Sequence, residues 1–180
     1  MECAFLERTD CFAVSPRTLR GERFKAGETT AMADAIIERV GEDELSTIAD
    51  LYNQIFRPPR DIDSFHRRFR GRYNVLQLVA RIGDHNVGFF IGFELKPSVF
   101  FAWFYGVLPD FRRQGIASQL MEAVHSWAQQ NEYESIRFEC HNQHRAMLHL
   151  AIALQYDIVG MRWDPDRGDN LVIFEKVLSG

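Results

Sequence analysis

The chain is poor in cysteine, lacks long apolar runs and carries no excess of positive charge. Its cysteines, Cys3, Cys11 and Cys140, are odd in number and widely spaced, so we expect neither a disulfide framework nor a metal site. A formal net charge of −4 disfavours general nucleic-acid binding, which depends on a positive surface. We find no apolar signal-peptide core near the N-terminus and no run suited to crossing a bilayer. The expectation is a cytoplasmic protein that binds neither nucleic acid nor membrane.

The pattern of apolar residues predicts one mixed domain over residues 32–180, preceded by a polar extension over residues 1–31. The extension is either loosely packed or an arm that covers the binding cleft of the domain or docks on a second subunit. A helix over 146–154 is apolar on nearly every side except at His149, which predicts a helix buried between layers. The other predicted helices span residues 42–56, 61–71 and 116–128, and the predicted strands span residues 35–40, 75–82, 87–95, 99–107, 135–140, 158–163 and 171–176.

One stretch, Val107–Ala117, carries most of the functional information. It joins an apolar strand to an amphipathic helix, and a helix N-terminus presents unpaired N–H groups and a positive dipole end that suit phosphate oxygens. Gly115 allows a close backbone approach, and Arg112 and Arg113 add cationic donors. The stretch therefore predicts a site for a diphosphate.

At these residues the chain resembles a known family. Arg112-x-x-Gly115-x-Ala117, preceded by Val107-x-Pro109, resembles the acetyl-CoA motif of the GCN5-related N-acetyltransferase (GNAT) superfamily, and the predicted order of elements is similar over residues 35–177. The resemblance implies an α/β (α+β) fold with a mixed, twisted central sheet of about 6–7 strands, flanked by about 4 helices, with splayed central strands.

The resemblance also implies acetyl-CoA (coenzyme A) as the donor, and no metal. Backbone groups of Tyr105 and Val107 would then hold the pantetheine where the strands splay, and Asn142 would hold the pantetheine or cap the following helix. The residues implied to hold the diphosphate are Arg112, Arg113, Gln114, Gly115, Ile116, Ala117 and Ser118.

Transfer to an amine requires a group that removes a proton. Glu139 is the first candidate, because Phe138-Glu139-Cys140 resembles the Leu-Glu-Val segment of ribosomal-protein alanine acetyltransferases, where the glutamate is implicated as base. The alternative is a strand glutamate that faces water or pairs with Arg137 or Arg145. Glu94, near the end of an earlier strand, is a second candidate.

The proton donor is where the chain departs from the family. Counting from Asn142 puts His149 at the position of the family's tyrosine, whereas counting back from Gln155-Tyr156 puts Ala151 there. A buried His149 would need a partner and could protonate the departing thiolate, or it could be a core histidine bonded to a carbonyl. If Ala151 is the equivalent, the family's acid is missing.

The preferred function is an N-acetyltransferase that uses direct attack in a ternary complex. Its acceptor would be a small-molecule amine or a peptide or protein amine, and a homodimer is possible. The rival is a non-catalytic or regulatory acyl-CoA-binding module, and a variant uses another acyl-CoA. An arginine-rich segment, residues 57–72, holds six arginines and two acids. It indicates either an acidic or phosphorylated acceptor or a solvated helix end.

Overall fold

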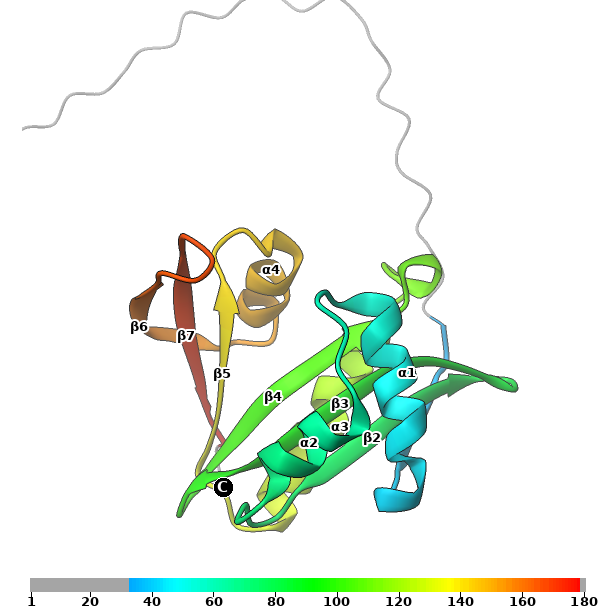
Figure 1. The fold of residues 1–180 in the computed structure, drawn as a ribbon. Coiled ribbons are helices and arrows are strands. Elements are labelled where there is room, and N and C mark those ends of the chain that lie inside the picture. Colours follow the sequence, from blue (N-terminus) through cyan, green and yellow to red (C-terminus); the bar gives the residue numbers. More distant parts are fainter. Residues whose placement is uncertain (1–32, 179–180) are drawn as a thin grey trace, which may run out of the picture.

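The computed structural model describes residues 33–178, so the extension predicted over residues 1–31 lies outside the described residues. One seven-stranded sheet, in the order β1-β2-β3-β4-β5-β7-β6, organises the chain (Figure 1). All neighbouring strands run antiparallel except β4 and β5. The strands are β1 (Ile36–Arg39), β2 (Leu76–Ile82), β3 (His85–Lys96), β4 (Val99–Val107), β5 (Ser135–His141), β6 (Asp157–Asp164) and β7 (Asp169–Val177).

Four α-helices and two 3-10 turns accompany the sheet, and the predicted fold class is confirmed. Gly83 and Asp84, whose composition is typical of a turn, join β2 to β3. Asp61 caps α2 by accepting a 2.8 Å hydrogen bond from the Ser64 N–H. The helical elements are η1 (Glu42–Glu44), α1 (Leu45–Ile55), α2 (Ile62–Phe69), η2 (Pro109–Phe111), α3 (Ile116–Gln130) and α4 (Arg145–Ala153).

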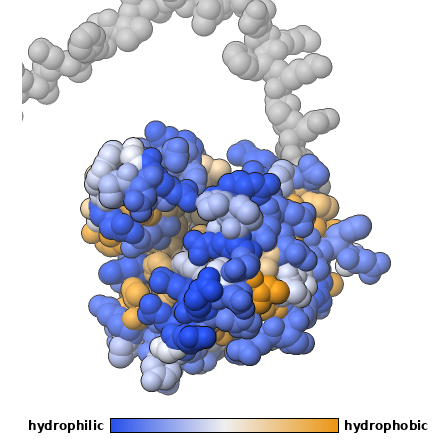
Figure 2. Space-filling model, in the orientation of Figure 1, coloured by the Kyte–Doolittle hydropathy of each residue, from blue (hydrophilic) through white to orange (hydrophobic). Residues whose placement is uncertain are grey.

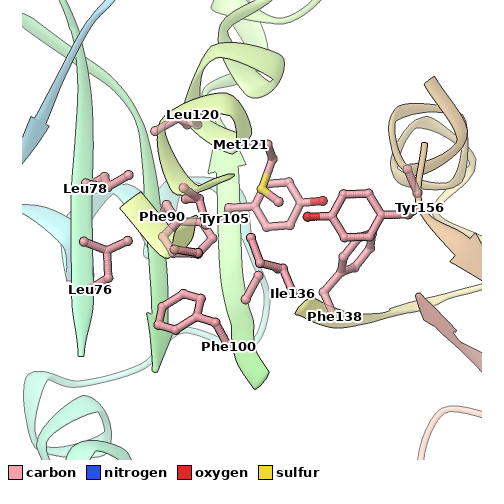
Figure 3. Packing of buried hydrophobic residues seen from close by; sticks show 14 of the residues in the cluster. Leu76, Leu78, Phe90, Phe100, Tyr105, Leu120, Met121, Ile136, Phe138 and Tyr156 are labelled. Atoms are coloured by element: carbon pink, nitrogen blue, oxygen red, sulfur yellow. The ribbon is translucent and has the colours of Figure 1, made fainter. Parts of the chain in front are cut away.

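The helices divide between the two faces of the sheet. On one face, α1 and α2 bury side chains such as Ile48 and Phe65 against Phe89 and Ile91 of β3. On the other face, α3 and α4 pack on a larger cluster, part of which Figure 3 shows, and Phe138 of β5 lies within it. Apolar residues buried on both sides of the central strands explain why those strands read as nearly continuous apolar runs.

The predicted burial of α4 between layers is wrong. Only Ala151 is buried in this helix, while His149 is exposed and Ile152 is 59% exposed. The helix lies over one face of the sheet next to β5, and the described residues place no further layer above it (Figure 1). The helix therefore has more apolar side chains than the sheet surface beneath it can cover.

A bulge and a divergence shape the centre of the sheet. Trp103 is an extra residue in β4, because Phe104 pairs with Ile91 while Ala102 pairs with the next residue of β3, Gly92. A Cβ at Gly92 would lie 2.7 Å from the Phe101 carbonyl oxygen, so glycine permits this close approach. Beyond Ala102, β4 no longer pairs with β5, and the two strands separate as Figure 1 shows.

Candidate functional site

The separated part of β4 has main-chain groups without a neighbouring strand. The Leu108 N–H donates to the Val87 carbonyl oxygen on the β3 side, and main-chain groups along a strand alternate in direction. The N–H and C=O groups of Tyr105 and Val107 therefore face the gap between β4 and β5. These are the two residues that sequence reasoning assigned to the pantetheine, and a linear amide chain fits such a row of donors and acceptors.

The turn after β4 leads into α3, a helix whose N-terminus has no side-chain cap. Gly115 adopts the left-handed conformation, with φ of 81°, and no side chain caps the N-terminus of α3. The first intrahelical bond of α3 runs from the Gln119 N–H to the Gly115 carbonyl, so the N–H groups of residues 116–118 have no partner within the helix. The predicted diphosphate residues are thus brought together at a backbone N–H cluster.

Side chains brace this turn rather than fill it. Arg112 donates from Nε to the Val107 carbonyl oxygen at 3.0 Å, which ties the turn to the end of β4. The Gln114 carbonyl accepts from the Ala33 N–H at 3.1 Å, and the Gln119 amide bonds the Ala33 carbonyl at 2.6 Å. Arg113 is exposed and has a positive φ of 66°. Arg112 therefore orients the turn, and Arg113 is left exposed beside it.

Glu139 lies on β5 just beyond its last pairing with β4, on the face that carries α1 and α2. Side chains alternate between the two faces along a strand, and Phe138, the residue before Glu139, lies in the cluster under α3 and α4. Glu139 accepts a 3.0 Å bond from Nη2 of Arg162 on β6, and 27% of its side chain is exposed. The predicted partners Arg137 and Arg145 are wrong, since Arg137 bonds Glu175 and Arg145 bonds Asn142.

A histidine and aspartate pair lies next to Glu139 on the same face. His141 Nε2 and Asp164 Oδ2 are 2.8 Å apart, and both side chains are less than one-fifth exposed. The hydrogen bond from His141 holds the pKa of Asp164 below its usual range. Burial, reinforced by His141, lowers the pKa of the neighbouring His144. Sequence reasoning missed this pair, whose only local signal was a histidine at the end of a predicted strand.

Two sequence candidates lie elsewhere or differ in role. Glu94 bonds Tyr133 and Asn74 at the end of the sheet where β4 and β5 are still paired, away from the divergence. Asn142 is not the cap of α4, because His144 is the N-cap residue and no side chain caps that helix. The Asn142 N–H bonds the Asn170 carbonyl, which places the residue at the open end of β5.

The tyrosine-like proton donor has no single counterpart. His149 is exposed, and the alternative position, Ala151, is buried and offers no proton. On the face of the sheet that carries α3 and α4, the hydroxyl groups of Tyr105 and Tyr156 approach one another (Figure 3). Burial raises the pKa of each. The Tyr156 hydroxyl is 2.8 Å from His125 Nε2, and burial lowers the pKa of that histidine to about 4.

Two surface hollows lie outside this site. One, of about 490 Å³, is bordered by Arg72 and Gln77, and another, of about 350 Å³, is bordered by His125 and Lys176. Neither includes Glu139 or the turn before α3. Figure 2 shows instead a notch between the part of the surface formed by α4 with β5–β7 and the remainder, above the divergence of β4 and β5.

Two features are absent from residues 33–178. These residues contain no group of three or more histidine, cysteine, aspartate or glutamate side chains arranged to hold a metal ion. The described helices include none with the length and apolar character needed to cross a membrane.

Comparisons with known proteins bear on this geometry. Residues 45–153 match the sequence model of the acetyltransferase (GNAT) family, and no curated protein sequence matches the chain. The ribosomal-protein-S18-alanine N-acetyltransferase from Escherichia coli has a similar structure, with a TM-score of 0.72 and 16% identity over 82% of this chain and 96% of that chain. Ard1 from Thermoplasma volcanium gives 0.68 and 16% over 81% and 99%. A putative acetyltransferase from Salmonella typhimurium, determined with its cofactor acetyl-CoA, gives 0.66 and 14% over 82% and 96%.

Proposed function

The chain belongs to the acetyltransferase (GNAT) family, and from that membership we propose that it transfers an acetyl group from acetyl-CoA to an amine by direct attack in a ternary complex. The observation that carries the proposal is the divergence of β4 from β5, which leaves the main chain of Tyr105 and Val107 facing a gap. The turn that follows β4 is tied to Val107 by Arg112 and leads to the uncapped N-terminus of α3 at Gly115.

The donor would be held mainly by main-chain groups. Tyr105 and Val107 would bond the pantetheine, and Asn142 at the end of β5 would approach it from the other side of the gap. The residues Arg112, Arg113, Gln114, Gly115, Ile116, Ala117 and Ser118 would surround the diphosphate. Holding donor and amine together supplies much of the acceleration, since effective molarities reach on the order of 10⁵–10⁸ M.

The amine must lose a proton as its nitrogen bonds to the thioester carbon. We infer two possible acceptors of that proton, Glu139 and His141. Glu139 already accepts a hydrogen bond from the Arg162 guanidinium, which competes with an incoming proton for the carboxylate. In the His141–Asp164 pair, an N–H on Nε2 donates to the carboxylate, and this tautomer leaves the lone pair of Nδ1 to take a proton.

The carbon–sulfur bond breaks as the new carbon–nitrogen bond forms, and the departing thiolate takes up a proton. His149 stays a predicted proton donor for this step. Its side chain is exposed, so it can regain a proton from solvent. If it plays no part, water supplies the proton. Substituting His149→Ala tests the assignment, because unchanged turnover excludes the role.

The acceptor is a small-molecule amine or a peptide or protein amine. The Escherichia coli relative acts on an alanine of ribosomal protein S18, which supports a peptide amine as one class to test. A cytoplasmic location and a possible homodimer stay predictions. The rival function, a non-catalytic or regulatory acyl-CoA-binding module, is supported by the absence of the family's tyrosine at both candidate positions, His149 and Ala151.

Two measurements test the proposal. Acetyl-CoA should raise the melting temperature of the protein more than longer acyl-CoAs, and pooled amines, polyamines and peptides should then release free coenzyme A thiol. Glu139→Gln and His141→Gln, measured separately, identify the base by the loss of kcat, which general-base catalysis sets at roughly 10²–10⁴-fold. Tight acyl-CoA binding without thiol release from any acceptor favours the binding module.

A further inference from the structure

Three arginines on the α1–α2 side of the divergence have no carboxylate partner. Arg60 precedes α2, Arg68 lies on it, and Arg72 follows it. The ion pair that this segment does make joins Arg67 to Asp61. Within residues 33–178, none of the three arginines forms an ion pair. Among the described residues, Arg57 and Arg70 of the same segment form none either, so what sets the three apart is the aromatic rings that they contact.

Aromatic rings hold the guanidinium groups in place. Arg60 Cζ lies 5.3 Å from the ring centre of Phe104 and 5.7 Å from that of Trp103. Arg68 Cζ lies 5.2 Å from the ring centre of Trp103 and 5.3 Å from that of Phe93. Stacking on an aromatic face leaves the edge of a guanidinium, with its N–H groups, free to bond an anion.

Arg60 is held by more side-chain hydrogen bonds than Arg68 or Arg72. The Asn53 side chain bonds both its main-chain groups, accepting from the N–H at 2.8 Å and donating to the carbonyl at 3.0 Å. The Arg60 Nε donates to the Tyr52 hydroxyl at 3.0 Å. Among the described residues, neither Nη atom has a hydrogen-bond partner. Four N–H donors in a fixed plane are therefore available to one ligand.

The three charges also repel one another. The pKa of Arg68 is lowered, first by burial and then by the charges of Arg72 and Arg60. The group stays protonated near neutral pH, so the repulsion remains in the free protein. An anion placed among the three would relieve it, and charge-assisted bonds to guanidinium are among the stronger protein hydrogen bonds.

The cluster lies beside the reacting centre. Trp103 is the bulge residue at which β4 leaves β5, and its contacts with Phe65 and Phe69 place it on the α2 face. Glu139 lies on that same face, on the adjoining strand, just past the last pair between the strands. An acceptor that presents its amine to the gap therefore has its neighbouring group beside Arg60 and Arg68.

We propose that the acceptor carries an anionic oxygen group, a carboxylate or a phosphate, near its amine, and that Arg60 and Arg68 bind this group. The proposal rests on the proposed amine acetylation and names the class of its acceptor. The aromatic rings of Trp103 and Phe104 would then contact the apolar part of the acceptor that links the anion to the amine.

Matched acceptor pairs test the proposal by thiol release at saturating acetyl-CoA. Phenylalanine with phenylalaninamide, and 4-aminobutyrate with butylamine, test a carboxylate at two spacings, while phosphoethanolamine with ethanolamine tests a phosphate. We expect kcat/KM to favour the anionic member of at least one pair. Arg60→Gln should reduce that preference roughly 10–100-fold through KM, the loss expected for a bond to a charged group. Raising the salt concentration should weaken it as well.

Two control variants separate specific binding from general charge. Arg67→Gln removes an equal charge from α2, the helix that follows Arg60, but from a side chain that is 63% exposed and paired with Asp61, and it should leave the preference intact. Arg60→Lys keeps the charge but loses the planar fork, so it should restore only part of the preference. Circular dichroism melting of each variant checks that the fold is retained.

The outcomes distinguish this proposal from the one on which it rests. If neutral acceptors release thiol as well as anionic ones, and Arg60→Gln and Arg67→Gln behave alike, the anion site is refuted while acetylation stands. If no acceptor releases thiol, acetylation fails. Calorimetry of the anionic probes with the protein and coenzyme A then decides the site alone, and binding that survives Arg60→Gln unchanged overturns it.

Discussion

Gly115 offers a direct test of the diphosphate site, because one substitution perturbs stability and ligand binding by separate routes. The residue has φ of 81° at the N-cap of α3, and an alanine in the left-handed region costs about 1–2 kcal/mol. For a chain of this length, 1 kcal/mol shifts the melting temperature by about 2–4 °C. Gly115→Ala should therefore lower the melting temperature of the free protein by roughly 2–8 °C.

A matched control exists in the β2–β3 turn. Gly83 also has a positive φ, of 55°, and a Cβ built there meets no atom within 4 Å. Gly83→Ala should therefore lower the melting temperature by a similar amount, but Gly83 takes part in none of the hydrogen bonds that hold the turn before α3 among the described residues. Any difference between the two variants in the presence of acetyl-CoA reports on ligand contact rather than on backbone strain.

The size of that difference follows from mass action. At a ligand concentration of 100 Kd, acetyl-CoA stabilises the native protein by about 2.7 kcal/mol, which is roughly 5–11 °C. Loss of one N–H bond to a phosphate oxygen weakens binding roughly 10–100-fold, which reduces the stabilisation to about 0.4–1.4 kcal/mol. Differential scanning fluorimetry should show this loss for Gly115→Ala and the full shift for Gly83→Ala. An equal shift in both variants would refute the placement of the diphosphate.

Other predictions address the base, the pantetheine site and a buried histidine. Asp164→Asn should lower kcat at least roughly 10²-fold if His141 is the base, and unchanged thiol release would assign the role elsewhere. Val107→Pro removes an N–H that faces the gap and no β3–β4 bond, so calorimetry should find acetyl-CoA binding weakened about tenfold in a folded protein; unaltered binding contradicts that placement. The pKa of His125 is lowered from 6.5 to about 4, so the unfolded chain binds the proton first and stability falls as pH drops from about 6.5 to 4, by roughly 1–2 kcal/mol after allowance for partial exposure. His125→Gln, which can still bond Tyr156, should make this slope smaller in urea unfolding between pH 7 and pH 4.5, while the lowered pKa of His144 leaves a part of it; a slope equal to that of the unmodified protein excludes His125.

The part of the site that the sequence predicted is encoded locally. Val107–Ala117 contains the strand end, the turn and the helix start in one contiguous stretch. Its glycine, its apolar strand and its amphipathic helix each have a direct physical reading. The expected residues therefore lie together, with Gly115 in the conformation that the glycine suggested.

The parts that the sequence did not predict depend on register between distant strands. As an alternative to a catalytic role, the sequence suggested that Glu139 pairs with Arg137 or Arg145, which lie near it in the chain. The residue that bonds Glu139 is instead Arg162 of β6, 23 positions along the chain. The pairing of His141 with Asp164 spans the same separation. Neither can be found without knowing how β6 and β7 align with β5.

The burial of α4 failed for a different reason. An apolar pattern states which side chains could be buried but not whether a second layer exists to cover them. In α4 the sheet covers the side of Ala151, and the side that carries Ile152 has no covering element among the described residues. The role assigned to His149 depended on that burial, so it is the weakest of the predicted assignments.

Donor and acceptor binding differ in how they are encoded. Most of the residues proposed to hold the donor lie on β4, on α3 and in the turn between them, inside the matched residues 45–153, and contacts through the main chain tolerate side-chain change. Arg162 and Asp164, which engage Glu139 and His141, lie beyond that matched stretch. If Glu139 or His141 removes the proton as proposed, β6 and β7 set the surroundings of the base from outside the matched stretch. For this reason, exchanging β6 and β7 with those of a relative should alter acceptor turnover while leaving acetyl-CoA affinity intact.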